Sequence, residues 1–574
     1  MMIGLMIAAA MRVAVPAIDL NGTWEFRFED KRALEDVADV RFAATDTMAV
    51  PGCFDVMPKW YMKRGTALYR RTFHLDKPVE NAWLVVEGMG LRGDFRVDGR
   101  PLGVHPYPYA RLELETGPLA AGEHEVFAAL DNRFDWDRLK LVRPYYDFYF
   151  YGGFYHGVKL IFDNRRLVVR TRDWKTGTVE IEARNFKEAD FDATLSFDAK
   201  SEVKAQFEKG RAVVRVPDFK LWSPAHPNLH TVALLQPDNQ AILSARFGIR
   251  TIEAKNRKLY LNGEEIYLKG VNRHDAHPLT GAATPQQLML KDVQLIRGLG
   301  ANFVRGAHYQ QSEQFLDLCD EYGILVWEES LGWGNGQFYT DKNGVELKDA
   351  GFFAAQVHET REMVRASINH PSIIISAFLN ECASDKPECK VLVDKLIETI
   401  RAEDTGHLVT FACNRSTREI CNANTDIVAF NTYPGTIPCV PGLPEELAEK
   451  VRSLPQHGIN AVTECLRKRY PDKTIIVSES GCGGRYGLHD PAAPVGSEEF
   501  QNEYLTDLIE TIFANPDLCG YAIWQFCDNR TYGRNSVEQQ GKPNGGHSIA
   551  GLVDVDRKPK MSYQTVKKFF TEKK

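Results

Sequence analysis

Two glutamates in the second half of the chain could supply a pair of catalytic carboxyl groups. Glu381 ends the run Ile-Ile-Ile-Ser-Ala-Phe-Leu-Asn-Glu (373–381), and Glu479 ends the run Thr-Ile-Ile-Val-Ser-Glu (474–479). Short apolar runs rich in β-branched residues are typical of buried strands, so each carboxyl group is expected at the tip of a strand. Two carboxyl groups about 5 to 5.5 Å apart can hydrolyse a glycosidic bond with retention, one as acid/base and one as nucleophile. Strands must therefore bring these two glutamates together.

Eight such runs occur in the second half of the chain, at 266–271, 301–305, 324–327, 372–379, 408–412, 426–431, 474–478 and 520–526. Segments with helical periodicity lie between most of them. The clearest are 284–299, with Pro285 at the first helical position, and 312–322. Because parallel strands need crossover helices, we expect a (β/α)8 TIM barrel. Glu381 would close its fourth strand and Glu479 its seventh, so the two would face each other across the barrel mouth.

The first 250 residues show a different pattern, with short alternating runs and turn-forming residues but no helices between them. This pattern indicates antiparallel sandwiches. We expect a jelly-roll, galactose-binding-like β-sandwich over 1–165 and an immunoglobulin-like β-sandwich over 166–250. The TIM-barrel catalytic domain would then occupy 251–574.

Composition limits the classes of partner. The chain has 574 residues, of which 44% are hydrophobic, and can therefore bury several cores. Its net charge of −7, with interspersed signs, gives no reason to expect a nucleic acid or a membrane as partner. The eleven cysteines contain no CxxC pair, which favours free thiols and a cytoplasmic location. The apolar stretch 1–10 lacks a positive region, so we interpret it as a misassigned start or a disordered leader, with secretion or the periplasm as the alternative.

Neighbouring residues suggest a different role for each glutamate. Asn380 could hydrogen-bond a sugar 2-hydroxyl group, a contact that strengthens in the transition state, which marks Glu381 as the acid/base. Tyr433 could hold Glu479 in the ionised form that a nucleophile needs. The alternative, that both are glutamates of surface loops, fits poorly with two strand tips.

Several motifs follow one another in a characteristic order: Leu-Tyr-Arg-Arg-Thr-Phe (68–73), Leu-Trp-Ser-Pro (221–224), Asn-Arg-His-Asp (272–275), Asn-Phe-Val-Arg-Gly-Ala-His (302–308), Asn-His-Pro-Ser (369–372), Asn-Glu (380–381), Ser-Glu (478–479) and Ile-Trp-Gln-Phe (523–526). With them the chain resembles glycoside hydrolase family 2, the group of β-galactosidases and β-glucuronidases, over essentially its whole length. The resemblance implies a carbohydrate substrate, Glu381 as acid/base and Glu479 as nucleophile. It also implies a set of substrate-binding residues: Asp147, His274, His308, Asn380, Asn431, Tyr433 and Trp524.

The sequence leaves the sugar open. β-Glucuronidases of the family hold the substrate carboxylate with an Asn-x-Lys-Gly motif, but here the same place reads His-Ser-Ile-Ala-Gly (547–551). Loss of that charged contact should weaken binding of a glucuronide by about 2 to 5 kcal/mol. A terminal β-galactoside is therefore slightly favoured. The alternative is a β-galacturonide, or an atypical glucuronide, bound by cations elsewhere; Arg485, Arg530, Arg534 and Lys542 could serve, although we interpret each as a solvated loop charge.

No cofactor is expected to be required. His274 and His277 could bind a metal ion, but two ligands without a third do not make a metal site. Some large members of the family use magnesium, but nothing in this sequence supports a divalent cation. A homo-oligomer is possible by analogy only. A hypothesis of another class, an inactive carbohydrate-binding relative, is disfavoured because both glutamates are present.

Overall fold

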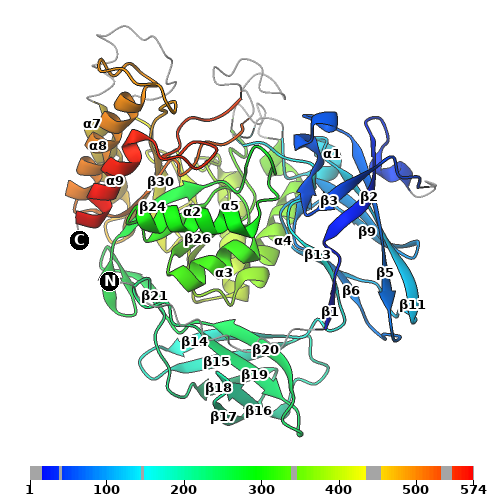
Figure 1. Cartoon of the computed structure of the whole chain (residues 1–574). Helices are drawn as coiled ribbons and strands as arrows, with labels where there is room; N and C mark the ends of the chain where they lie inside the picture. The colour runs from blue at the N-terminus through cyan, green and yellow to red at the C-terminus, as the bar shows by residue number, and fades with distance from the viewer. Residues whose placement is uncertain are drawn as a thin grey trace.

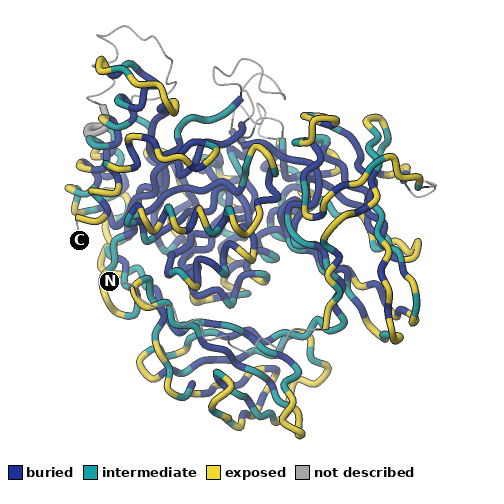
Figure 2. The backbone as a smooth tube through the Cα atoms, viewed as in Figure 1, coloured by how far each residue is buried: buried dark blue, intermediate teal, exposed yellow. Residues whose placement is uncertain are grey.

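The computed structural model describes residues 16–37, 42–143, 146, 148–337, 345–434, 454–531 and 546–572, with backbone alone for 454–457. The barrel lies at the centre, the N-terminal β-region on one side of it, and a smaller β-region below both (Figure 1). Burial is concentrated inside the barrel and between the sheets of each β-region (Figure 2). The predicted multidomain architecture is thus confirmed, and we keep 1–165, 166–250 and 251–574 as a proposed division into domains.

The N-terminal region is a sandwich of antiparallel sheets. One sheet has the order β1 (Ala17–Asp19), β13 (Val158–Ile161), β6 (Trp83–Val86) and β10 (Leu112–Glu115). A second has the order β3 (Asp46–Val50), β2 (Gly22–Glu29), β5 (Thr66–Leu75), β11 (Gly122–Asp131), β8 (Arg92–Val97) and β9 (Arg100–His105). A small third sheet joins β4 (Gly52–Cys53), β12 (Gly153–Phe154) and β7 (Met89–Gly90), and a short helix α1 (Trp136–Leu139) follows β11. Trp24 and Phe26 of one large sheet share a core with Leu84 and Leu160 of the other, which holds the two sheets face to face.

The second region is also a two-sheet sandwich. Its sheets are β14 (Arg166–Asp173), β15 (Thr178–Arg184) and β18 (Arg211–Arg215), and β17 (Ser201–Phe207), β16 (Phe191–Phe197), β19 (His230–Leu235) and β20 (Ala241–Phe247). A hairpin meander of β21 (Ile252–Lys255), β22 (Lys258–Leu261) and β23 (Glu264–Ile266) then leads into the barrel. Leu259 and Leu261 of the meander share a buried cluster with Ile427 of a barrel strand, so the meander covers the amino-terminal end of the barrel.

All eight predicted barrel strands are present and parallel. They are β24 (Leu268–Arg273), β25 (Phe303–Gly306), β26 (Leu325–Glu329), β27 (Ile373–Ala377), the interrupted strand β28 (Leu408–Thr410) with β29 (Ala412–Cys413), β30 (Ile427–Asn431), β31 (Thr474–Ser480) and β32 (Leu518–Ile523). Because β24 pairs with both β25 and β32, and the interrupted strand pairs with both β27 and β30, the sheet closes on itself.

Helices cover the outside of the barrel (Figure 1). Those described are α2 (Gln286–Gly298), α3 (Glu313–Tyr322), α4 (Ala350–Ser367), α5 (Pro387–Glu403), α7 (Leu454–Arg469), α8 (Glu498–Ala514) and α9 (Met561–Glu572). Ser312 caps α3 by accepting a hydrogen bond from the backbone N–H of Phe315 at 3.1 Å, a contact worth about 1 kcal/mol. Pro285 caps α2 rather than occupying its first turn, a shift of one residue from the prediction.

Side chains of the barrel strands alternate between the barrel interior and the helices. In β26, Leu325 and Trp327 belong to the interior cluster, whereas Val326 packs among the helices. The next interior position at the carboxyl end of this strand is Glu329, and the equivalent position of β30 is Asn431. The alternation therefore places these polar side chains in the interior, at the open end of the barrel.

A β-bulge breaks this alternation in β31. Val477 packs among the helices, so strict alternation would point Glu479 the same way. However, Phe430 of β30 pairs with Val477 and Asn431 pairs with Glu479, which leaves Ser478 as an extra residue. Such a bulge re-aims the side chains that follow it. Here it turns Glu479 from the helix side to the barrel interior.

Within the described residues, no helix is both long and apolar enough to cross a membrane. The ten cysteines in this part of the chain are all free thiols, as predicted from their spacing.

Candidate active site

Glu479 lies at the carboxyl end of β31, with 3% of its surface exposed. Its Oε1 accepts a hydrogen bond from Nη1 of Arg305 at 2.5 Å, and its Oε2 accepts one from the hydroxyl of Tyr433 at 2.6 Å. Both contacts stabilise a negative charge and fix the plane of the carboxylate. The partner predicted for Glu479, Tyr433, is therefore found in contact with it.

Glu381 follows β27, in a tight turn at the open end of the barrel. The turn places both Leu379 and Glu381 in the left-handed region, at φ of 48° and 52°. Such backbone geometry costs of order 1–3 kcal/mol and is held here in part by the hydrogen bond from the Glu381 N–H to the carbonyl of Ala412 at 2.9 Å. The carboxyl group accepts hydrogen bonds from the side-chain amides of Asn431 and Asn414, each at 3.0 Å. Glu381 thus accepts hydrogen bonds from two neutral amides, whereas Glu479 accepts one from a guanidinium group.

Arg305 connects the two glutamates. It is fully buried at the carboxyl end of β25 and donates to Glu479, to both oxygens of Glu329 (2.8 to 3.1 Å) and to Oδ1 of Asn380 at 3.0 Å. The same oxygen of Asn380 accepts from Asn431 at 3.0 Å, and Asn431 donates to Glu381. A continuous chain of hydrogen bonds therefore runs from one glutamate to the other.

Asn380 is buried within this network. Both contacts of its oxygen are internal, while its Nδ2 lies 3.5 Å from Nε2 of His308. The amide nitrogen is thus the part of Asn380 that can still donate a strong hydrogen bond, as the predicted contact with a sugar 2-hydroxyl group requires.

His274, His308 and Trp524 form one wall of the site. The ring of Trp524, the residue after β32, stacks on His308 with centroids 5.3 Å apart, and both rings lie within 5.5 Å of the His274 ring. Burial and the Arg305 guanidinium lower the pKa of His308 to about 3, and burial holds the pKa of His274 well below its usual range. Both imidazoles are therefore neutral near pH 7. Nε2 of His274 is buried with no hydrogen-bond partner among the described residues, so it is available to a substrate.

The N-terminal sandwich contributes to the same wall. Phe148 lies 5.2 Å from the ring of His274 and 6.0 Å from that of His308. Asp147, the neighbouring residue for which a sugar-binding role was predicted, lies outside the described residues, and its role stays a prediction.

Several site residues were missed by the sequence analysis, among them Arg305, Glu329, Asn272 and Asn414. Arg305 and Glu329 occupy the last interior positions of β25 and β26, and charged residues at the ends of barrel strands were the signal that could have identified them. Asn272 donates to the carbonyl of Ser478 at 2.9 Å and accepts from Arg305 at 2.9 Å. It therefore holds the bulge and the guanidinium group together.

The segment 547–551, where a carboxylate-binding motif was sought, contains neither lysine nor arginine. Ser548 lies 3.2 Å from the side-chain nitrogen of Gln525, which also donates to Asn529 at 2.7 Å. Lys560 donates to the carbonyl of Ile549, but its charge is paired with Asp528 at 2.8 Å. Lys560 is thus no substitute for the missing lysine.

The four loop cations named from the sequence differ in their surroundings. Arg485 is exposed, as predicted. Arg530 is only 6% exposed, so its interpretation as a solvated loop charge was wrong: three tyrosine rings of the N-terminal sandwich cover it. Arg534 and Lys542 lie outside the described residues.

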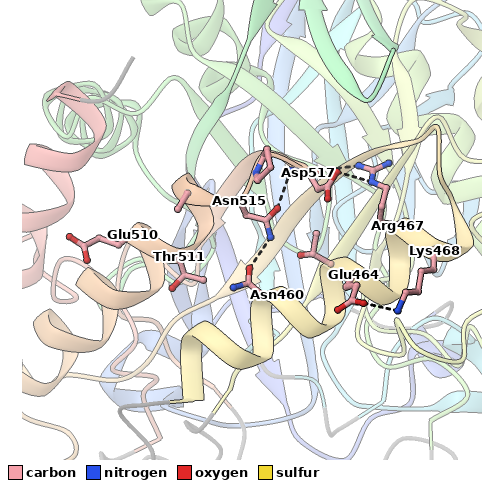
Figure 3. A pocket seen from close by; sticks show the side chains of 11 residues that line it. Asn460, Glu464, Arg467, Lys468, Glu510, Thr511, Asn515 and Asp517 are labelled. Atoms are coloured by element: carbon pink, nitrogen blue, oxygen red, sulfur yellow. Dashed lines mark hydrogen bonds and ion pairs between the residues drawn. The ribbon is translucent and has the colours of Figure 1, made fainter.

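A hollow of about 790 Å³ lies elsewhere, between α7 and α8 (Figure 3). Asn515 and Asp517 on its rim directly precede β32, which puts the hollow at the amino-terminal end of the strands, opposite the glutamates. Its polar side chains already pair with one another, as Asn515 does with Asn460 and Arg467 with Asp517. It therefore lacks the convergent free polar groups of a binding site.

Among the described residues, one cluster has the ligand types and spacing to bind a metal ion, namely Asp317, Asp320 and His370. Arg246 contacts both carboxylates, and His370 lies 2.7 Å from Asp320. These side chains form an ion-paired network between the second sandwich and the barrel, outside the site of the two glutamates. The prediction that no cofactor is required stays a prediction.

Comparison with known proteins agrees with the geometry. Residues 252–574 match the family model described as glycosyl hydrolases family 2, TIM barrel domain. A β-glucuronidase of Streptococcus agalactiae is 24% identical over 96% of this chain and 95% of its own length, whereas a β-galactosidase of Thermoanaerobacter pseudethanolicus is 25% identical over 79% of this chain and 60% of its own. The crystal structure of a β-galacturonidase from Eisenbergiella tayi bound to galacturonate has 28% identity and a TM-score of 0.81, covering 97% of each chain. The chain thus belongs to glycoside hydrolase family 2.

Proposed function

We propose that this protein is a retaining exo-β-glycosidase in which Glu479 is the nucleophile and Glu381 the acid/base. The observation that carries the proposal is the contrast between the contacts of the two carboxyl groups. Glu479 accepts from a guanidinium group and a phenol, whereas Glu381 accepts from the neutral amides of Asn431 and Asn414. The guanidinium and phenol contacts suit the carboxylate that attacks the anomeric carbon, and the amide contacts suit the carboxyl group that donates and accepts the proton.

In the first step, a carboxylate oxygen of Glu479 bonds to the anomeric carbon while the bond from that carbon to the leaving oxygen breaks. The proton of Glu381 moves to that oxygen. In the second step, the Glu381 carboxylate takes a proton from water, and the water oxygen displaces Glu479 from the anomeric carbon. Arg305 holds Glu479 in place throughout, and Trp524 provides the wall against which the sugar lies.

For the sugar itself, we propose a terminal β-hexuronide, with galacturonide first. The relatives that match this chain along nearly their whole lengths include two named as uronidases, and one of these, at 28% identity, is bound to galacturonate. The neutral β-galactoside, slightly favoured from the sequence, is the second candidate because segment 547–551 contains no lysine or arginine. Its named relative is matched over only 60% of its own length.

Retention is tested by following the product by proton NMR during hydrolysis of a nitrophenyl β-glycoside. The first-formed free sugar should be the β-anomer, with the α-anomer appearing later by mutarotation. An initial α-anomer would show inversion and overturn the two-step mechanism. Glu479→Gln, which keeps the shape of the side chain, should remove turnover while the protein stays folded.

The sugar is tested with a panel of nitrophenyl β-galacturonide, β-glucuronide and β-galactoside. The proposal predicts the highest kcat/KM for the galacturonide. A preference for the galactoside of tenfold or more would contradict it, and no turnover of any glycoside would favour an inactive carbohydrate-binding relative.

A further inference from the structure

Arg530 lies in the loop that follows β32, six positions after Trp524. The loop packs against the substrate side of the N-terminal sandwich: the backbone N–H of Tyr149 donates to the carbonyl of Arg530 at 3.2 Å. Phe148, next to Tyr149, is in the wall with His274. Arg530 thus sits where the barrel loop and the sandwich meet at the mouth of the site.

The guanidinium group of Arg530 is held by aromatic rings. Its central carbon lies 3.8 Å from the ring centroid of Tyr149, 4.9 Å from that of Tyr61 and 5.9 Å from that of Tyr151. Such stacking fixes the plane of a guanidinium group but uses none of its N–H donors. Nη2 of Arg530 is buried and has no hydrogen-bond partner among the described residues.

The charge of Arg530 has no ion-pair partner in this part of the chain, and it acts on the buried Asp55 only at longer range. Arg64 places a second guanidinium group 4.8 Å from the same Tyr149 ring, but Arg64 donates to the carbonyls of Asn132 and Phe150 and lies 3.9 Å from Asp55. Burial raises the pKa of Asp55, while the charges of Arg64 and Arg530 act to lower it. Among the described residues, no carboxylate forms an ion pair with Arg530, and a buried cation that lacks a contacting carboxylate is costly.

We propose that Arg530 is the residue that binds the substrate carboxylate, in place of the Asn-x-Lys motif that segment 547–551 lacks. The inference rests on the proposed uronidase function. A planar guanidinium group held by stacked rings and carrying an unused donor is suited to a planar carboxylate. The segment that lacks the motif runs beside Arg530. The backbone carbonyl of Asn529 accepts a hydrogen bond from the backbone N–H of Ser548 at 2.8 Å, and the backbones of Arg530 and His547 form an antiparallel β-bridge.

The test compares Arg530→Gln and Arg530→Lys with wild type on nitrophenyl β-galacturonide and β-galactoside. Removing one partner of a buried charged contact weakens substrate binding strongly. We therefore expect kcat/KM for the galacturonide to fall at least roughly 30-fold in Arg530→Gln. The carboxylate is remote from the bond that breaks, so the loss should lie mainly in KM. The galactoside has no carboxylate, so kcat/KM for it, however low, should change by less than about threefold in Arg530→Gln.

Two control variants separate binding from packing. Arg64→Gln removes the other guanidinium group from the Tyr149 ring and should lower thermal stability, with equal effects on both substrates. Arg485→Gln removes an exposed cation and should leave both activities unchanged. An equal loss on both substrates in folded Arg530→Gln would assign the residue a structural role and overturn the proposal.

A binding measurement covers the case in which Arg530→Gln does not fold. Galacturonate should raise the Tm of wild type more than galactose does, and Arg530→Lys, which keeps the charge but not the forked donor geometry, should lose most of that difference. An unchanged difference in Arg530→Lys would contradict the proposal. If wild type hydrolyses only the galactoside, the uronidase function itself fails; if it hydrolyses the galacturonide and Arg530→Gln does so equally well, only the assignment of Arg530 fails.

Discussion

Tyr433→Phe tests the environment of the nucleophile with the smallest possible change. The substitution removes the hydroxyl that donates to Oε2 of Glu479 at 2.6 Å and keeps the ring. Hydrogen bonds to charged groups are worth about 1.5 to 3 kcal/mol, and each 1.36 kcal/mol is tenfold in rate. We therefore expect kcat/KM on a nitrophenyl glycoside to fall roughly 10- to 150-fold, with little change in Tm.

Tyr470→Phe is the matched control. The hydroxyl of Tyr470 donates to a carboxylate oxygen of Glu419 at the same distance of 2.6 Å, but this pair lies near the end of α7, outside the site. Its loss should lower the free energy of unfolding and leave kcat unchanged. A decrease of less than threefold in Tyr433→Phe, or an equal decrease in both variants, would refute the account of how Glu479 is held.

Three further predictions concern the acid/base, a histidine and a helix cap. Glu381→Ala should lose 10²- to 10⁴-fold in kcat/KM on a glycoside with a poor leaving group and little on a dinitrophenyl glycoside, which needs no proton; equal losses would contradict the acid role. The contact with Asp320 raises the pKa of His370 to about 9 despite its burial, so its stabilisation is fully present below pH 6.5 and is lost as the pH rises through 9. Urea unfolding should therefore show that the free energy of unfolding of wild type falls by about 3 kcal/mol more than that of His370→Gln between pH 6 and 10. An equal dependence on pH in the two proteins would contradict this role of His370. Ser312→Ala should lower the free energy of unfolding by about 1 kcal/mol through loss of the α3 cap, with unchanged kcat; an unchanged unfolding midpoint would show that the cap contributes nothing.

The strands and the two glutamates were predictable because apolar runs that end in a carboxylate can be recognised locally. Arg305 and Glu329 could also have been found, since they continue the interior-facing series of β25 and β26 by one further step of two residues. The sequence predicted that Glu479 faces the barrel mouth, but not the backbone irregularity that turns it there. That irregularity is the bulge at Ser478, and the pairing that creates this bulge involves β30, a strand distant in the sequence.

The burial of Arg530 could not be predicted from the sequence either, because it also depends on residues that are distant in the chain. Its neighbours Tyr61, Tyr149 and Tyr151 belong to the N-terminal sandwich, so a cation that reads as a loop charge becomes buried only when the two regions dock. Short-range patterns predict elements and strand ends well. Contacts between regions decide which polar groups remain available to a ligand.

The most direct test of the central claim is mass spectrometry of the enzyme after incubation with a 2-deoxy-2-fluoro glycosyl fluoride of the preferred sugar. The slow second step of this reagent traps the glycosyl-enzyme. One equivalent of label should appear on the peptide that contains Glu479, together with loss of activity, and Glu479→Gln should take up none. Labelling of Glu381 instead, or continued full activity without any label, would contradict the assignment of Glu479 as nucleophile.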